Sequence, residues 1–434
     1  MRRSALALLL GCLLLVAGAS ALDGYDYYQT IEYAACDQET YQQDIVIHRS
    51  TGTAYNETAG GLETWHVFVG EHCREDYGDV RFTNSSAELE YYLWPDYNSS
   101  SARVTVRLGG ADRGGVLTVH YGNATAETTS DGDATYLLYD TFDGSSLDTK
   151  KWSAFGGGTK SLSSGTLTLY GNNVGYIGIR SVQSFSGSVA IETNTRFEGD
   201  AGGQGSWWWG FFGSGQIPNN VVNQLATSLK RIVYTEWGRS DVYEVTADTA
   251  DGSTGSYQST GIPCRLASNW GECQPATDSR LSWISGTSAK YQYGATTQTL
   301  TTGVPSTACD VLFALGDTYS SYGGITLEVQ YVHVRAYSAT PPAASTFSGE
   351  QEATGTLHAF PGIPRTPQDL NGDGLYTDIN GNGRLDYNDL IIFFQHLTWA
   401  KTAQPTSCFD FNGNGWLDYN DVITLFSIIT EEHP

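Results

Sequence analysis

Positively charged side chains are scarce in this sequence, and methionine is almost absent. Its 434 residues include 23 Lys and Arg against 47 Asp and Glu, which gives a formal net charge of −24. Because binding to a nucleic-acid backbone needs clustered Lys and Arg, the composition argues against nucleic acid as a partner. The chain is rich instead in glycine, with 50 residues, and in tyrosine, with 27. We therefore expect a mainly β protein of about two to four domains.

Long hydrophobic runs are missing except at the N-terminus. There, Arg2-Arg3 precede the apolar residues 5–16, and Ala19-Ser20-Ala21 follow. This order is that of a secretory signal peptide, with cleavage expected after about Ala21. A competing interpretation is a lipoprotein signal, since Leu9-Leu10-Gly11-Cys12 resembles a lipoprotein box. We expect a secreted or cell-surface protein whose mature chain does not span a membrane.

Cysteine and histidine spacings typical of zinc sites, such as CxxC and HExxH, are also missing. Cysteines of exported chains commonly form disulfides. We predict the pairs Cys36–Cys73 and Cys264–Cys273, because each pair lies within one expected domain. Cys309 and Cys408 fall in different domains, and we expect them to be thiols.

Residues 22–139 form the first expected β domain, with alternating strands at 41–47 and 103–108. All four N-glycosylation sequons of the chain lie here, and they would mark solvent-facing loops in a host that glycosylates. Their asparagines are Asn56, Asn84, Asn98 and Asn123.

One motif of this segment resembles a known family. The run Cys73-Arg74-Glu75-Asp76-Tyr77-Gly78-Asp79-Val80-Arg81-Phe82-Thr83 resembles the C-R-x-D-F-G-D-I-R-F-T signature of an uncharacterised β domain of exported and surface proteins in archaea and bacteria. Val119-His120-Tyr121-Gly122-Asn123 is similar to the end of a later strand of that family, whereas Tyr91-Tyr92-Leu93-Trp94 departs from its Tyr-Trp-x-Glu run. The resemblance implies no chemistry. We expect Arg81 to be buried and paired with Asp76 or Asp79.

Residues 140–338 form the second expected β domain. Its opening at 140–152 and its closing strand at 326–335 resemble the concanavalin A-like jelly-roll sandwich of legume lectins and laminarinases. This resemblance implies a fold that hosts both glycan-binding proteins and hydrolases.

The paired-glutamate strand of the hydrolases, E-x-D-x-x-E or E-x-D-x-E, is absent from this segment. The nearest candidate pair is Glu192 and Glu198, which lie about 20 Å apart along a strand at about 3.3 Å per residue. Retaining glycosidases need carboxyl groups about 5–5.5 Å apart, and inverting ones about 6.5–9.5 Å. We therefore expect no catalytic residues, with a polysaccharide hydrolase as the alternative.

A run of aromatic residues, Trp207-Trp208-Trp209-Gly210-Phe211-Phe212, reads as one strand. Alternation sends Trp207, Trp209 and Phe211 to one face of the sheet and Trp208 and Phe212 to the other. One set can fill the core, and the other can stack on sugar rings. Coverage of both faces by loops or by the neighbouring domain is the alternative.

Residues 339–365 are rich in Pro, Ala, Ser and Gly, which is typical of a semi-extended linker.

Residues 366–434 then carry two segments, 378–389 and 410–421, that differ only at their second and seventh positions. Each has oxygen-bearing side chains at positions 1, 3, 5, 9 and 12 and a glycine at position 6, while position 7 offers its main-chain carbonyl, as in a calcium loop. We predict two calcium ions, with the ligands Asp378, Asn380, Asn382, Arg384, Asp386 and Asp389, and Asp410, Asn412, Asn414, Trp416, Asp418 and Asp421.

A half-loop precedes this pair, with Asp369, Asn371 and Asp373 at positions 1, 3 and 5. It places Asn380 at position 12, so its set of ligands is incomplete. It could bind a third ion by sharing Asp378, or it could form a rigid turn, and both alternatives stay open.

Loop-then-helix repeats with Asp at position 12 resemble dockerin modules. The helices expected at 390–397 and 422–429 have apolar residues at helical spacing and can pack on each other. The resemblance implies docking onto a cohesin-type β-sandwich through loop positions 10 and 11, which are Tyr387, Asn388, Tyr419 and Asn420. The alternative is that calcium only stabilises a C-terminal cap.

The sequence therefore favours an archaeal-type secreted or surface protein that displays a lectin-like sandwich and attaches to a partner through a calcium-loaded dockerin-like module. A dockerin-borne polysaccharide hydrolase and a purely structural surface protein are the alternatives.

Overall fold

The computed structural model describes residues 22 and 24–432, except for 60–61, 85–86, 110–113, 173, 199–205, 217–222, 232–242, 252–254, 265–271, 294–295, 317–323, 353–356 and 415–416. Between residues 223 and 277, only the backbone is described. The expected signal peptide lies outside the described residues. No helix in the described part of the chain combines the length and the apolar character needed to cross a membrane.

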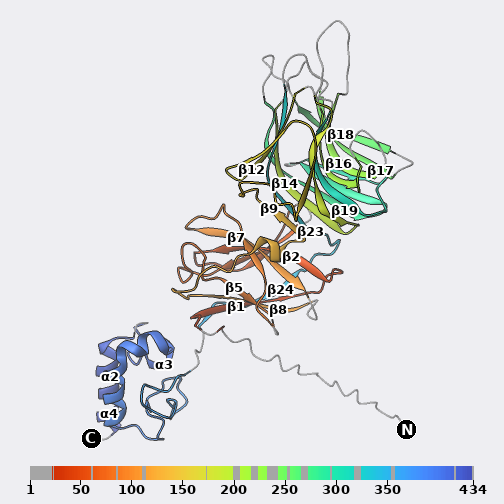
Figure 1. Cartoon of the computed structure of the whole chain (residues 1–434). Helices are drawn as coiled ribbons and strands as arrows, with labels where there is room; N and C mark the ends of the chain where they lie inside the picture. The colour runs from red at the N-terminus through yellow and green to blue at the C-terminus, as the bar shows by residue number, and fades with distance from the viewer. Residues whose placement is uncertain are drawn as a thin grey trace, which may run out of the picture.

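The N-terminal domain is a sandwich of two five-stranded sheets (Figure 1). Ile45 and Ile47 of the second sheet face the core together with Trp65 and Val67, as alternation along a strand requires. The first sheet contains β1 (Tyr27–Tyr33), β8 (Gly115–Tyr121) and β5 (Arg81–Thr83). The second contains β3 (Tyr55–Ala59), β4 (Leu62–Phe68), β2 (Thr40–His48), β7 (Ser101–Gly109) and β6 (Tyr91–Leu93), and a short helix, α1 (Gly132–Thr135), follows.

The remaining strands of the first sheet come from the segment expected to be a linker. β24 (Ala344–Phe347) pairs antiparallel with β1, with Ile31 opposite Phe347, and β25 (Gln351–Glu352) extends the pairing. The prediction of a spacer at 339–365 is therefore wrong for its first half. Ala344 and Phe347 pack against the N-terminal core, and this burial outweighs a composition typical of a linker. The second sandwich is thus an insertion within the first.

The inserted domain, residues 138–336, is a sandwich of two antiparallel sheets around one core, and the mainly β expectation is confirmed. The expected strand 326–335 is β23. The seven-stranded sheet contains β10 (Trp152–Gly156), β13 (Ile177–Phe185), β22 (Cys309–Gly316), β15 (Ser206–Gly213), β16 (Asn223–Arg231), β17 (Tyr243–Asp251) and β18 (Gly255–Cys264). The eight-stranded sheet contains β11 (Thr159–Ser163), β12 (Thr166–Gly171), β23 (Ile325–Ala336), β14 (Val189–Glu198), β19 (Glu272–Ser285), β20 (Ser288–Tyr293), β21 (Thr296–Leu300) and β9 (Leu138–Asp140).

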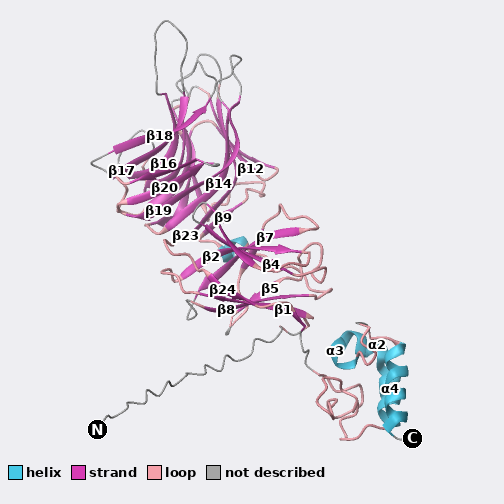
Figure 2. Ribbon diagram, turned by 180° about the vertical axis from the view of Figure 1, so that it is seen from behind, coloured by secondary structure: helices cyan, strands magenta, loops and turns pink. Residues whose placement is uncertain are grey.

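The C-terminal segment contains α2 (Tyr387–Ala403), α3 (Thr406–Phe409) and α4 (Tyr419–Glu432). Helices are present at both predicted positions, and each is longer than the periodic segment suggested. Their small core includes Phe393, Leu425 and Phe360, and the last of these comes from the expected linker. Figure 2 shows these helices apart from both sandwiches.

Candidate functional site

The first expected calcium loop folds around the carboxylate of Asp378. Its Oδ1 accepts a hydrogen bond from the main-chain N–H of Asn382 at 3.0 Å, and its Oδ2 accepts one from the main-chain N–H of Gly383 at 2.6 Å. Gly381 and Gly383 have φ values of +66° and +85°. L side chains rarely adopt such angles, so glycine at position 6 allows the chain to turn around the carboxylate.

Asp389 closes this loop and lies in the first turn of α2. It is fully buried, and its two oxygens accept hydrogen bonds from the main-chain N–H groups of Asn380 at 3.0 Å and Asp386 at 2.9 Å. Asp386 is the N-cap of the helix and forms a capping box with Asp389. Burial raises the pKa of the Asp389 carboxyl, and the charges of Asp378 and Asp386 raise it further. Such a carboxylate gains stability from a bound cation.

The second loop repeats this arrangement. Asp421 is fully buried and accepts hydrogen bonds from the amides of Asn412 at 3.3 Å and Asp418 at 2.7 Å. Burial raises the pKa of the Asp421 carboxyl, as do Asp410 and Asp418. Trp416 lies outside the described residues.

The half-loop has the same local geometry as the first half of a complete loop. Asp369 accepts hydrogen bonds from the Gly372 amide at 2.7 Å and the Gly374 amide at 2.9 Å. Asp373 accepts one from the Leu375 amide at 2.8 Å, as Asn382 does from Arg384 in the first loop. Whether the half-loop holds an ion stays a prediction.

Carboxylates alone do not make either loop a metal site. Among the described residues, no group of three or more His, Cys, Asp or Glu side chains is gathered closely enough to hold a metal ion. Calcium, however, takes six or more oxygen ligands, including amide and main-chain carbonyls. A site in the first loop therefore needs Asn380, Asn382 and the carbonyl of Arg384 beside the carboxylates. This mixed set of hard oxygens fits calcium chemistry.

The two long helices expose a repeated apolar face. Tyr387, Ile391 and Phe394 on α2 occupy the same positions of the repeat as Tyr419, Ile423 and Phe426 on α4. These six side chains, called here the helix-pair face, are 46–63% exposed. The contacts between them are reciprocal, because Tyr387 meets Phe426 at 6.3 Å and Phe394 meets Tyr419 at 6.1 Å between ring centroids. Exposed apolar patches of this kind mark interaction surfaces.

The aromatic strand β15 alternates as the sequence predicts. Trp207 and Trp209 are fully buried in the core of the inserted sandwich, so the expectation that they bind glycan is wrong. Trp208 lies on the opposite face of the seven-stranded sheet and is only partly buried. It packs there with Phe212, Leu312 and Phe155.

Polar groups lie on that same face of the sheet opposite Phe212, which is four residues along β15 from Trp208. The Asp310 carboxylate accepts a hydrogen bond from Ser184 Oγ at 2.6 Å and lies 3.8 Å from the Arg180 guanidinium. Arg180 also lies over the Phe155 ring, at 5.7 Å from its centroid. An aromatic platform beside fixed hydrogen-bonding groups is an arrangement that suits a sugar.

The outer face of the eight-stranded sheet instead meets the N-terminal domain at one end. On its outer face, Glu192 pairs with Arg335 at 3.1 Å and with Arg280 at 3.7 Å, and Arg335 also pairs with Asp44 of the N-terminal sheet at 3.0 Å. Glu192 is therefore held in the contact between the domains rather than directed at a substrate. The Glu198 side chain lies outside the described residues.

The predicted disulfide between Cys36 and Cys73 is not formed. Cys73 follows His72, whose ring stacks on Tyr27 at the start of β1, while Cys36 follows the end of the same strand. A strand of this length spans about 20 Å, whereas disulfide-bonded Cα atoms lie about 4.4–6.8 Å apart. The side chains of Cys264 and Cys273 lie outside the described residues, and Cys309 and Cys408 are thiols as expected.

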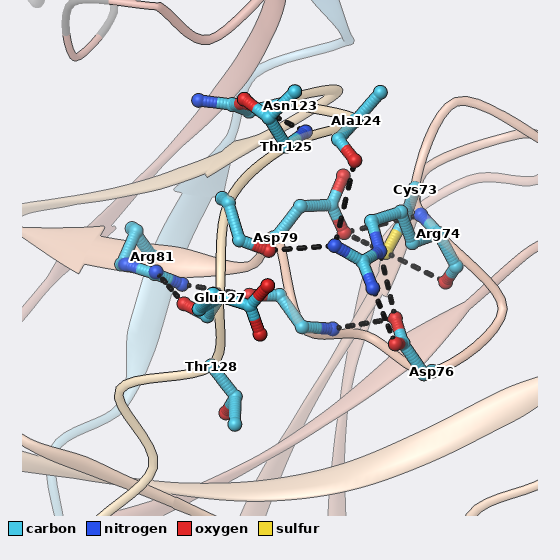
Figure 3. Close-up of polar contacts among 12 residues, drawn as sticks. Cys73, Arg74, Asp76, Asp79, Arg81, Asn123, Ala124, Thr125, Glu127 and Thr128 are labelled. Carbon is cyan, nitrogen blue, oxygen red and sulfur yellow. Dashed lines mark hydrogen bonds and ion pairs between the residues drawn. The ribbon is translucent and has the colours of Figure 1, made fainter.

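The side chains of Asp79 and Arg81 in the signature motif hydrogen-bond mainly to main-chain groups of the surrounding loops, and not to each other as an acid–base pair would (Figure 3). Asp79 is fully buried and accepts hydrogen bonds from the Arg74 amide at 3.1 Å, the Gly122 amide at 2.9 Å and the Cys73 thiol at 3.3 Å. Arg81 is buried as expected, but its predicted pairing with Asp76 or Asp79 is wrong. Its guanidinium donates to the carbonyl oxygens of Gly78, Val80 and Glu127, and Asp76 pairs with Arg74 at 2.6 Å.

Comparisons with known proteins gave one family match and several structural neighbours. Residues 76–155 match the profile of a domain of unknown function, DUF2341. No curated protein matches the chain. Among solved structures, a β-glucanase from Bacillus licheniformis is 16% identical, with 46% of this chain and 97% of that chain covered and a TM-score of 0.31. A β-1,3-glucanase from Mycobacterium marinum is 18% identical over 46% and 98% of the two chains, with a TM-score of 0.31. LamAcat from Zobellia galactanivorans is 12% identical over 47% and 100%, with a TM-score of 0.32. These values carry no argument about activity.

Proposed function

We propose that this protein is an exported attachment protein that displays a glycan-binding sandwich and docks through its C-terminal helix pair when calcium is bound. Export rests on the N-terminal signal, with cleavage after about Ala21. The calcium sites are the two loops at 378–389 and 410–421, and the partner is a cohesin-type β-sandwich.

The helix-pair face is the observation that carries this proposal. Six large apolar side chains are exposed on two helices, and the closing aspartate of each calcium loop lies in the first turn of its helix. Ion binding at Asp389 and Asp421 would therefore fix the start of both helices and hence the relative position of the two halves of the face. Asn388 and Asn420, beside Tyr387 and Tyr419, supply polar groups at its edge.

The glycan-binding part rests on the position of Trp208. The eight-stranded sheet meets the N-terminal domain at Arg335 and Glu192, so the outer face of the seven-stranded sheet is the better candidate for a ligand. Trp208 can stack on a sugar ring there, and the Arg180 guanidinium on the same face of the sheet can hydrogen-bond hydroxyl groups.

Binding of the mature protein to a panel of cohesin-type domains, measured by calorimetry with calcium and with chelator, tests the docking. We expect binding only with calcium, and a loss of at least tenfold in affinity when Ile391 and Ile423 are both changed to Asp. Thr424→Asp is the matched control, because it adds a charge to α4 outside the six-residue face. Equal binding by the double variant, or full binding in chelator, would contradict the proposal.

A glycan array probed with the wild type and with Trp208→Ala tests the sugar face separately. We expect Trp208→Ala to lose glycan retention while it keeps the thermal stability of the sandwich. Retention that is unchanged in this variant would remove the glycan-binding part of the proposal and leave docking intact.

A further inference from the structure

A histidine is enclosed where the two sandwiches meet. His333 on β23 is fully buried, and its ring is nearly parallel to those of Tyr136, at 4.4 Å and 20°, and Tyr139, at 5.2 Å and 14°, whose own centroids are 6.1 Å apart. Trp94 and Tyr331 approach at 4.8 Å each. Trp94 belongs to the N-terminal domain and Tyr331 to the inserted one, so the box of rings is built from both.

Neither ring nitrogen of His333 has a hydrogen-bond partner among the described residues. By contrast, the buried His120 of the N-terminal domain has both nitrogens bonded, to the Leu22 amide at 3.0 Å and to Thr83 Oγ1 at 2.8 Å. A buried imidazole without partners is costly when neutral and more costly when charged.

The charges around the box oppose a proton on His333. Burial lowers the pKa of His333 well below its ordinary value of 6.5, and the guanidinium groups of Arg103 and Arg335 lower it further, while Asp44 acts in the opposite direction. Arg103 lies over the Trp94 ring at 3.4 Å from its centroid. Further charged groups around this contact are Glu192, Arg280, Lys151, Asp133, Asp278, which accepts a hydrogen bond from Tyr331, and Asp96, which pairs with Arg103.

The hydrogen bonds that hold the domains together are next to this ring. The Ala336 amide donates to Gln42 Oε1 at 2.8 Å, and the Leu137 amide donates to the Val334 carbonyl at 2.8 Å. Opening the contact would expose His333 to water, where it can take up a proton. Closing it would require that proton to leave.

We infer that the contact between the two sandwiches is an acid-sensitive latch, which opens on protonation of His333. The open state binds one proton more than the closed state at pH values below about 6.5, so its population rises about tenfold for each pH unit. Opening would uncover the outer face of the eight-stranded sheet and let the two domains move about their two connections. The inference does not depend on calcium or on glycan binding.

Hydrogen exchange of the full mature chain with calcium, followed by mass spectrometry from pH 7.5 to 4.5, tests the latch. For the peptides that contain Leu137 and Ala336, the protection factor is the intrinsic exchange rate divided by the observed one. In the wild type, it should fall about tenfold for each pH unit below about pH 6.5. His333→Phe keeps an aromatic ring in the box, and His333→Gln keeps a polar one. Both should hold protection constant over this range.

His72→Gln is the matched control, because His72 is a partly exposed histidine of the N-terminal domain paired with Glu350. It should keep the wild-type dependence on pH. The titration of Asp44 does not interfere above pH 4.5: burial alone would raise the pKa of this carboxyl, but Arg335 outweighs it and holds the pKa below its ordinary value of 3.8. Protection independent of pH in the wild type, or an equal fall in both His333 variants, would overturn the latch.

Discussion

Replacing Arg335 by Met should destabilise the two sandwiches together. Arg335 is 1% exposed, and its guanidinium pairs with Asp44 at 3.0 Å and with Glu192 at 3.1 Å. It also donates to the Gln42 carbonyl. Met fills a similar volume but leaves the buried Asp44 carboxylate without its ion-pair partner and Glu192 with Arg280 alone. Removing one partner of a buried ion pair costs about 3–5 kcal/mol, so we expect a loss of that size in the free energy of unfolding.

The assay is urea unfolding at pH 7.5, followed by tryptophan fluorescence. Arg196→Met is the matched control on the same sheet, because Arg196 pairs with Glu328 at 3.0 Å and both side chains are 30% exposed. Exposed pairs contribute about 0–1 kcal/mol, so its effect should be small. In Arg335→Met with Asp44→Leu, part of the stability should return, since the buried charge is gone. A loss below about 1 kcal/mol in Arg335→Met, or one equal to that of Arg196→Met, would refute the reasoning.

Three further predictions concern the candidate sites. Asp389→Ala and Asp421→Ala should each abolish about one ion of bound calcium in equilibrium dialysis, and a stoichiometry unchanged from the wild type would exclude the loop concerned. Trp207→Ala should lower the free energy of unfolding by about 3–5 kcal/mol, because its ring fills the core, and thermal melts should show Trp208→Ala far less affected. Purified protein should release no reducing ends from β-glucans or galactans, and turnover that is lost in Glu192→Gln would show that the inserted domain is a hydrolase.

Local rules predicted the features that depend on neighbouring residues. Alternation placed Trp207 and Trp208 on opposite faces of β15, and the calcium-loop repeat predicted helices near α2 and α4, which begin three residues earlier than the expected starts at 390 and 422. These features follow from backbone geometry within a few residues, so the sequence contains enough information to find them.

Contacts between distant parts of the chain were not predicted. The pairing of β24 with β1 joins Phe347 to Ile31, and nothing in a segment rich in Pro and Ala indicates a strand partner so far away. The Arg81 side chain bonds to main-chain carbonyls, which have no sequence signature, rather than to the nearest aspartates. The ion pairs of Arg335 depend on the insertion of one sandwich into the other, which only the structure reveals.

Calcium-dependent folding of the helix pair is the most direct test of the central claim. Isolated helices below about 12–15 residues barely hold in water, and α4, with 14 residues, is in this range, while α2, with 17, is only slightly longer. A fragment of residues 357–434, which includes Phe360 of the helix core, should gain helical circular dichroism when calcium is added to the chelated protein. Magnesium should substitute poorly, because Mg²⁺ requires near-ideal octahedral geometry and gives up its water ligands reluctantly. Full helicity in excess chelator would contradict the account, because calcium would then not control the docking face.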